Sequence, residues 1–245
     1  MKSPVLSVLA LTLIAGSAHA SVNLTFQNGV NGYAGTQDTE LRSSPADTGT
    51  PQGGFESISV DGDDGSPDRK PNHGLVRFDS VFGAAAGQIN AGDTIINATL
   101  TLNVINPGSG LSMYDMLVDW NQATATWDSL GNGIQGDGVE ASSIALAVLG
   151  ANDSAENVPT GLLVIDVTAS LQKVQAGLLP GYGWGLVPFA SGTNGIDIET
   201  SEAFLASARP MLSVEVAPVP EPETYALMLA GLGLVGLVAR RRKSA

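Results

Sequence analysis

The sequence predicts an all-β fold: a single antiparallel β-sandwich with jelly-roll-like connections and one short helix. The chain has 245 residues, with 30 Gly and 13 Pro against 6 Phe, 4 Tyr and 3 Trp. Such a mixture is typical of many short strands separated by turns, not of long helices. Several segments also alternate apolar and polar residues, as half-buried strands do. Since 43% of the residues are hydrophobic, a sizeable core is expected.

Charge and cysteine content exclude several classes of protein. The formal net charge is −13, and residues Ser21 to Pro220 hold 6 basic and 22 acidic residues, a net charge of −16. A surface this acidic repels a phosphate backbone, so we expect no nucleic-acid partner. Because the chain has no Cys, thiol catalysis, disulfides and Cys-ligated metal centres are excluded.

The first twenty residues have the three parts of a secretory signal peptide. Lys2 precedes an apolar run from Val5 to Ala15, and the small residues Ala18 and Ala20 stand before Ser21. This order predicts a signal peptide over 1–20, cut by signal peptidase between Ala20 and Ser21. The alternative is a buried N-terminal helix.

The body is predicted over 21–217 as one domain of about ten short strands. The clearest strand is NATLTLNVI, in which Leu100, Leu102 and Val104 alternate with polar residues. The other expected strands span 22–26, 56–60, 75–78, 112–119, 144–149, 161–167, 182–189 and 211–216. One helix is expected over 168–176, with Asp166 or Thr168 as its cap and Gly177 at its end.

Seven pieces of the body, taken in order, resemble a known domain. They are TFQNGVNGYAGTQDTEL, HGLVRFD, INATLTLNV, the pair Trp120 and Trp127, Asp166-Val167-Thr168, Gly183-Trp184-Gly185-Leu186 and Arg209-Pro210-Met211-Leu212. Together they resemble the DNRLRE domain, a secreted β-sandwich grouped with CBM96-like carbohydrate-binding modules. The resemblance implies a sandwich that binds extracellular polysaccharide. Because the body has only 6 basic residues, alginate is not the expected ligand.

The densest acidic cluster is a candidate calcium site. It lies in the Gly-rich run 61–68, and its carboxylates are Asp61, Asp63, Asp64 and Asp68. Carboxylates on such a loop are ligands that Ca²⁺ prefers, although the spacing does not match an EF-hand. The alternative is a solvated acidic turn, which is common. We expect no other cofactor.

Residues for catalysis are not singled out by any pattern. His73 is the one His that remains after removal of the signal peptide, and no G-x-S-x-G elbow accompanies it. We therefore expect His73 to be structural or exposed, and the protein not to be an enzyme. The 22 acidic residues still leave open a small secreted hydrolase that uses a carboxylate pair.

Tryptophan side chains are the candidates for stacking on a sugar ring. We expect Trp127 and Trp184 in the core, where large aromatic residues of a sandwich usually lie. Trp120 is followed by Asn121 and Gln122, so we predict that Trp120 is exposed and binds carbohydrate together with Asn121. Arg77 is expected to be half-buried and paired with an Asp, since its side chain points opposite to those of Val76 and Phe78.

The C-terminal tail, residues 218–245, has three parts. Pro220-Glu221-Pro222 precedes an apolar stretch over 225–239, and Arg240, Arg241, Arg242 and Lys243 follow it. As a helix this stretch spans roughly 22 Å, which is short for a membrane core of about 30 Å, and the Arg cluster favours a cytoplasmic end. The arrangement resembles the PEP-CTERM sorting tail of Gram-negative bacteria. The alternative is an ordinary membrane anchor.

That second resemblance implies a route and partners. The inner membrane would hold the tail transiently through a transmembrane helix over 225–239, with Arg240, Arg241 and Arg242 as its stop. An exosortase would recognise Pro220, Glu221 and Pro222 and release the cargo to the cell surface or an exopolysaccharide matrix. We therefore expect an exported, non-catalytic protein that binds or structures polysaccharide of a biofilm matrix. A purely structural matrix protein is the further alternative.

Overall fold

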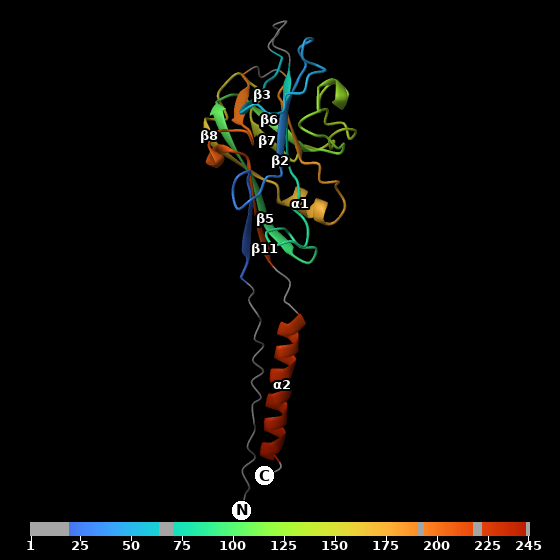
Figure 1. Ribbon diagram of the computed structural model, residues 1–245, viewed down its shortest axis with the longest axis vertical. Helices are drawn as coiled ribbons and strands as arrows, with labels where there is room; N and C mark the ends of the chain where they lie inside the picture. Colours follow the sequence, from blue (N-terminus) through green and yellow to red (C-terminus); the bar gives the residue numbers. More distant parts are fainter. Residues whose placement is uncertain (1–19, 64–70, 191–193, 218–221, 244–245) are drawn as a thin grey trace, which may run out of the picture. The chain divides into compact units, whose positions relative to one another are not determined.

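The strands of this protein form two antiparallel sheets. A computed structural model describes residues 20–63, 71–190, 194–217 and 222–243 (Figure 1). Residues Ser21–Ala217, here called the body, form one compact unit that holds every described strand, and the described residues 222–243 lie outside this unit. The strands are β1 (Val22–Phe26), β2 (Thr36–Arg42), β3 (Ser57–Val60), β4 (Asn72–Phe78), β5 (Thr94–Asn106), β6 (Gly110–Asp115), β7 (Ala147–Gly150), β8 (Gly161–Asp166), β9 (Trp184–Pro188), β10 (Ile196–Glu199) and β11 (Met211–Ala217).

Each sheet is assembled from strands that are distant in the sequence. The first sheet has the order β1-β11-β5-β10-β3. Strand β8 also pairs with β5, on the edge of β5 opposite to β11. The second sheet has the order β2-β4-β9-β6-β7. Of the strand neighbours in sequence, β6 and β7 are paired directly, whereas most other connections pass from one sheet to the other. The fold therefore rests on long-range pairing, and the all-β prediction with two antiparallel sheets is confirmed.

Two apolar clusters stabilise these sheets. The larger cluster lies between them and includes Leu100 and Val214 of the first sheet and Val76 and Leu186 of the second. Leu75 belongs to the smaller cluster because successive side chains of a strand point to opposite faces. The segment 116–141, which includes the short helix η1 (Asp128–Leu130), supplies most of this smaller cluster. The second sheet is therefore buried on both of its faces.

Most of the predicted strands are present, and two were missed. The alternation over 22–26 predicted β1 correctly, and the nine-residue alternating segment lies inside β5. The strand predicted over 112–119 is wrong beyond 115, because β6 ends at Asp115. β2 and β10 were not predicted. Their sequences, TQDTELR and IDIE, are rich in acidic residues that the fold buries or pairs at long range.

The predicted helix is present as α1 (Thr168–Gln175). The residue at the N-cap position is Val167, so the prediction of Asp166 or Thr168 as the cap is wrong, although the Asp166 carboxylate accepts a hydrogen bond from the backbone N–H of Thr168 at 2.8 Å. Gly177 follows the helix with φ +71°, a conformation that favours glycine. A second 3₁₀ turn, η2 (Ala206–Ala208), precedes β11.

The tail forms α2 (Pro222–Lys243), which contains the apolar stretch 225–239. Among the residues that the structure describes, no helix is long and apolar enough to cross a membrane. The transmembrane prediction is therefore not supported. Gly231, Gly233 and Gly236 interrupt the apolar stretch, and Glu223 and the Arg cluster bound it closely. Residues 1–19 of the predicted signal peptide, including Ala18, lie outside the described residues, whereas Ala20 and Ser21 are described and exposed.

Candidate functional site

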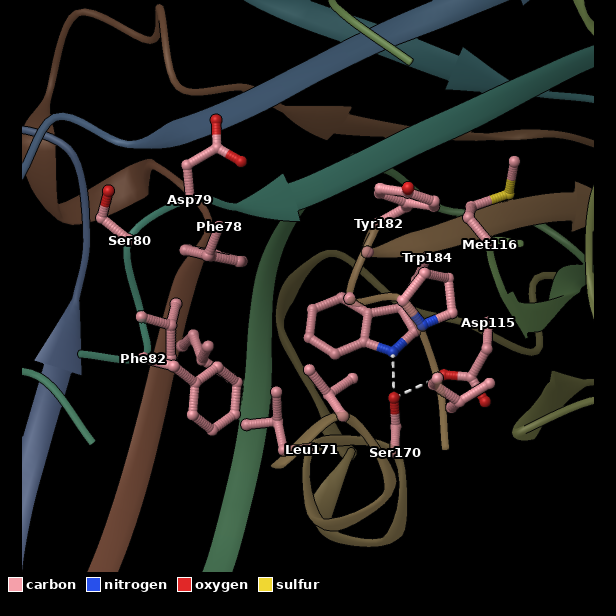
Figure 2. A pocket seen from close by; sticks show the side chains of 17 residues that line it. Phe78, Asp79, Ser80, Phe82, Asp115, Met116, Ser170, Leu171, Tyr182 and Trp184 are labelled. Carbon is pink, nitrogen blue, oxygen red and sulfur yellow. Dashed lines mark hydrogen bonds between the residues drawn. The ribbon is translucent and has the colours of Figure 1, made fainter. Parts of the chain in front are cut away.

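The candidate site is a pocket beside helix α1 of the body (Figure 2). It has a volume of about 210 Å³, which is smaller than the ~300–1,000 Å³ typical of sites for drug-sized ligands. Helix α1 lines it with Ser170 and Leu171, and the chain before β9 adds Tyr182. The end of β4 and the residues after it add Phe78 and Asp79. Asp115 and Met116, at the end of β6, and Leu212 of β11 complete the lining, so four separate parts of the chain meet at this pocket.

A buried polar network forms one wall of this pocket (Figure 2). The Ser170 hydroxyl donates a hydrogen bond to Asp115 Oδ1, and Trp184 Nε1 donates to Ser170 Oγ at 3.0 Å. All three residues are buried. Because each polar group has a partner inside the protein, the network fixes the wall of the pocket.

The mouth of the pocket carries the groups that a ligand can reach. The Asp79 side chain is 42% exposed, and Tyr182 is half-buried. Ser80 is exposed and adopts φ +57°. Both Asp79 carboxylate oxygens have protein partners, since Oδ1 lies 3.1 Å from Arg77 Nε and Oδ2 accepts from Gln37 Nε2. The Ser80 and Tyr182 side chains are therefore the groups here that suit a neutral polar ligand with hydroxyl groups.

Arg77 holds Asp79 at this mouth. Its Nε lies 3.1 Å from Asp79 Oδ1, and its Nη1 lies 2.6 Å from Asp119 Oδ1. The Arg77 side chain is 13% exposed, and its guanidinium lies 5.2 Å from the centre of the Trp120 ring. The prediction of a half-buried Arg77 paired with an Asp is confirmed.

The prediction that Trp120 is exposed is wrong. Trp120 is 5% exposed and belongs to the smaller cluster. Its Nε1 donates a hydrogen bond to the backbone carbonyl of Tyr182 at 2.8 Å. Asn121 is exposed, but its Oδ1 accepts from the N–H of Ala123 at 2.9 Å and organises a turn. The polar residues after Trp120 suggested a surface, whereas the segment 116–141 folds over the second sheet and buries the ring.

The other two tryptophans contribute to the packing. Trp184 is buried between the sheets, as predicted. Trp127 is half-buried and packs on the smaller cluster, with its ring centre 4.8 Å from that of His73. None of the three therefore offers an open ring face of the kind expected for a sugar.

His73 is structural, which was one of its two expected roles. It is 7% exposed, and its Nδ1 accepts a hydrogen bond from the backbone N–H of Ile134 at 3.0 Å. Burial lowers the pKa of His73 to about 4. His73 is therefore neutral at pH 7, and it joins β4 to the segment that covers the second sheet.

The calcium prediction falls largely outside the described residues. Asp64 and Asp68 lie there, whereas Asp61 and Asp63 are described. Asp61 pairs with Asn72 through backbone hydrogen bonds of 3.1 and 2.8 Å. In the described part of the chain, no group of three or more acidic or His side chains gathers as a metal site would require.

Asp38 and Glu202 form a carboxyl pair that was not predicted from the sequence. Asp38 is buried in β2, and its Oδ2 accepts from the N–H of Ser201 at 2.8 Å. Burial, followed by the nearby charge of Glu202, raises the pKa of Asp38 to about 8. Gln122 donates to Glu202 Oε1 at 3.3 Å and completes the group. The two acids are far apart in sequence, so no local pattern could reveal them.

The comparisons with known proteins bear on the tail alone. Residues 218–243 match the PEP-CTERM protein-sorting motif, and no curated protein matches the chain. The predicted sorting residues Pro222, Arg240, Arg241 and Arg242 lie in α2, whereas Pro220 and Glu221 lie outside the described residues. The motif indicates an exported protein whose tail an exosortase processes. The likeness of the body to the DNRLRE domain stays a prediction.

Proposed function

We propose that the body is an exported, non-catalytic protein that binds or structures extracellular polysaccharide after exosortase processing. The observation that carries this proposal is the sorting motif over 218–243, attached to a β-sandwich of net charge −16. A tail of this kind directs its cargo out of the cell. The acidic surface keeps the released body soluble and away from nucleic acid.

The proposed route has two processing steps. Signal peptidase cuts between Ala20 and Ser21, and the tail holds the chain at the inner membrane transiently. Exosortase recognition at Pro220, Glu221 and Pro222 then releases the body to the surface or matrix of a Gram-negative cell. Proline disfavours helical structure in the residue before it, and an extended element suits recognition by a protease.

The pocket beside α1 is the proposed ligand site. At its mouth the Ser80 and Tyr182 side chains supply hydroxyl groups and a ring edge for sugar hydroxyls. Its small size favours a single sugar residue or a chain end. The resemblance of the body to a jelly-roll-like DNRLRE sandwich supports the same class of ligand. The negative charge of the body disfavours a strongly anionic polysaccharide.

A carboxylate-dependent hydrolase is the second candidate, and the pair Asp38 and Glu202 is the observation that favours it. A glycosidase needs two carboxyl groups, one of which has a raised pKa. However, Asp38 is 2% exposed and accepts a backbone hydrogen bond from Ser201. A substrate cannot reach a carboxyl group held in this way, so we favour binding over hydrolysis.

Co-sedimentation tests the binding proposal. The body should sediment with matrix polysaccharide of the producing organism, and Tyr182→Ala should weaken retention, since the ring is at the pocket mouth. Phe204→Ala is the matched control, because Phe204 is an aromatic residue with 85% exposure outside the pocket. Equal retention of both variants would overturn the assignment of the pocket. If the body releases sugar from the polysaccharide and Glu202→Gln abolishes that release, the hydrolase is supported instead. If the body neither binds the polysaccharide nor releases sugar, the alternative of a structural matrix protein is supported.

Replacement of the recognition element tests the route. The chain with Pro220, Glu221 and Pro222 all changed to Ala should remain in the cell fraction, whereas the control Ser244→Ala should be released. Equal release of the two variants would contradict exosortase recognition at this element.

A further inference from the structure

A second pocket lies beside the candidate site and shares a residue with it. It has a volume of about 350 Å³ and is lined by β1, by the turn over 31–33 and by the loop over 85–88. Ser80 lines both this second pocket and the first one, which is the candidate site described above. Figure 2 shows Ser80 next to Asp79, across the first pocket from Ser170. The two pockets therefore meet at Ser80.

The backbone between the two pockets is fixed by hydrogen bonds. The Tyr33 hydroxyl donates to the carbonyl of Asp79 at 2.8 Å, and the N–H of Asp79 donates to the carbonyl of Gly35 at 2.7 Å. Gln88 Nε2 donates to the carbonyl of Ser80 at 2.8 Å. Ser80 is held between these contacts at φ +57°, which is uncommon for a residue other than glycine. The separation of the two pockets is thus set before a ligand binds, which lowers the cost of ordering the site.

The second pocket has polar side chains that the protein itself does not use. Asn23, Asn31 and Ser80 are exposed, and within the described chain none of their side chains forms a hydrogen bond or ion pair. Asn31 lies in a tight turn, because the N–H of Tyr33 donates to the carbonyl of Val30 at 2.9 Å. Two amides and a hydroxyl offer a ligand both donors and acceptors.

The lining of the second pocket also indicates the charge of its ligand. None of the twelve described residues that line it is charged, although the body carries a net charge of −16. Leu24 and Tyr33 add apolar surface, since both are half-buried against the larger cluster. Amides and apolar surface together suit a neutral sugar residue. They do not suit a uronate or a phosphate, whose charge would have no cation beside it.

We propose that an internal stretch of a neutral polysaccharide lies across both pockets, with consecutive sugar residues on the two sides of Ser80. This inference rests on the proposed function, in which the first pocket binds polysaccharide. Taken alone, the first pocket is small and suits one sugar residue or a chain end. With the second pocket beside it, the chain continues past Ser80 and makes contacts on both sides. A longer chain therefore binds more tightly than a single sugar.

Co-sedimentation with the matrix polysaccharide of the producing organism tests the second pocket. The double variant Asn23→Ala with Asn31→Gly removes both amides, and glycine tolerates the left-handed backbone at position 31. Each neutral hydrogen bond that is lost costs about two- to tenfold in affinity. The double variant should therefore bind the polysaccharide at least about fourfold more weakly than the wild type. An unchanged melting temperature would show that the variant is folded.

Asn97→Ala with Asn132→Gly is the matched control. Asn97 is exposed and pairs with Glu215 from β5, as Asn23 does from β1. Asn132 is exposed, has φ +75° and precedes a glycine, as Asn31 does. Neither control residue lines either pocket, so the control should bind like the wild type.

The results separate this inference from the proposed function. If Tyr182→Ala weakens retention and the double variant of the second pocket does not, the first pocket still binds polysaccharide and the inference is overturned. Equal weakening by the double variant and its control would also overturn it. A double variant that weakens retention when Tyr182→Ala does not would show that the chain does not lie across both pockets. A wild-type body that is not retained would overturn the proposed function and the inference together.

Competition by fragments of the same polysaccharide tests whether an internal stretch is bound. Partial hydrolysis gives fragments that can be separated by size. On the wild type, longer fragments should displace the polysaccharide at lower molar concentration than the monosaccharide does. The double variant Asn23→Ala with Asn31→Gly should lose most of this advantage. Equal potency of the monosaccharide and the longer fragments on the wild type would contradict binding across both pockets.

Discussion

The Oδ2 atom of Asp38 accepts a hydrogen bond from the backbone N–H of Ser201 at 2.8 Å, across 163 positions of the chain. Two residues further along β2, Glu40 Oε2 accepts from the N–H of Ser59 at 3.0 Å. Both carboxyl groups thus join the edge of the second sheet to backbone groups associated with the first. At this edge the sandwich is held by carboxyl–backbone hydrogen bonds in addition to apolar contacts, and this makes its stability depend on pH.

Asp38→Asn should reduce that pH dependence. In the folded state burial and the charge of Glu202 raise the pKa of Asp38 to about 8, from its ordinary value of 3.8. Between these values the folded protein holds a proton that the unfolded chain releases, so stability falls as pH rises through this window. Asn mimics the protonated carboxyl and does not titrate. The melting temperature of the variant should fall less than that of the wild type between acidic and mildly alkaline pH.

The control for Asp38→Asn is Asp137→Asn at an exposed acidic residue. This control should show the pH dependence of the wild type. Parallel melting curves of the wild type and Asp38→Asn across the whole range would show that Asp38 is ionised in the folded protein.

His73 should titrate far below its usual range. Burial lowers its pKa to about 4 from 6.5, so the unfolded chain binds a proton in this window that the folded protein does not. Stability should therefore fall as pH drops from 6.5 towards 4. Because the body contains a single His, one imidazole resonance in an NMR titration reports it directly. A midpoint near 6.5 would mean that the ring is solvated.

Ser170→Ala should destabilise the wall of the pocket. The change removes the donor to Asp115 and the acceptor of Trp184, both buried. Leaving buried polar groups without partners costs about 1–3 kcal/mol in the free energy of unfolding. Urea unfolding measures this cost. Thr124→Ala, at an exposed hydroxyl, should lie within about 0.5 kcal/mol of the wild type, and a similar result for Ser170→Ala would contradict the network.

Gly183 and Gly32 provide a matched pair of substitutions. Both have φ +78°, so alanine strains the backbone equally at each. At Gly183 a Cβ would lie 2.3 Å from the Val76 carbonyl oxygen, whereas at Gly32 nothing lies within 4 Å. Gly183→Ala should therefore lower the free energy of unfolding by about 1–3 kcal/mol more than Gly32→Ala. Equal losses would show that Val76 and Gly183 are not in close contact.

The strands that could be predicted from the sequence are those in which apolar and polar residues alternate. Apolar and polar residues alternate along the strand Val22–Phe26, and its bounds were predicted correctly. β2 was missed because two of its inward-facing residues are Asp38 and Glu40, which find their partners elsewhere in the chain. Trp120 was misplaced for a related reason, since the segment that buries its ring closes over the second sheet only in the folded state.

The candidate site was harder to predict than the fold. The sorting motif is contiguous, so its residues could be read directly from the sequence. The pocket joins Asp79, Asp115, Ser170 and Tyr182 from separate elements. No local sequence pattern marks any of these residues, and long-range strand pairing brings them together. The same holds for Asp38 and Glu202.

Mass spectrometry of the protein released by producing cells tests the central claim most directly. The released chain should begin at Ser21 and end close to the recognition element Pro220-Glu221-Pro222. A chain found in the cytoplasm with both Met1 and Ala245 still in place would contradict it.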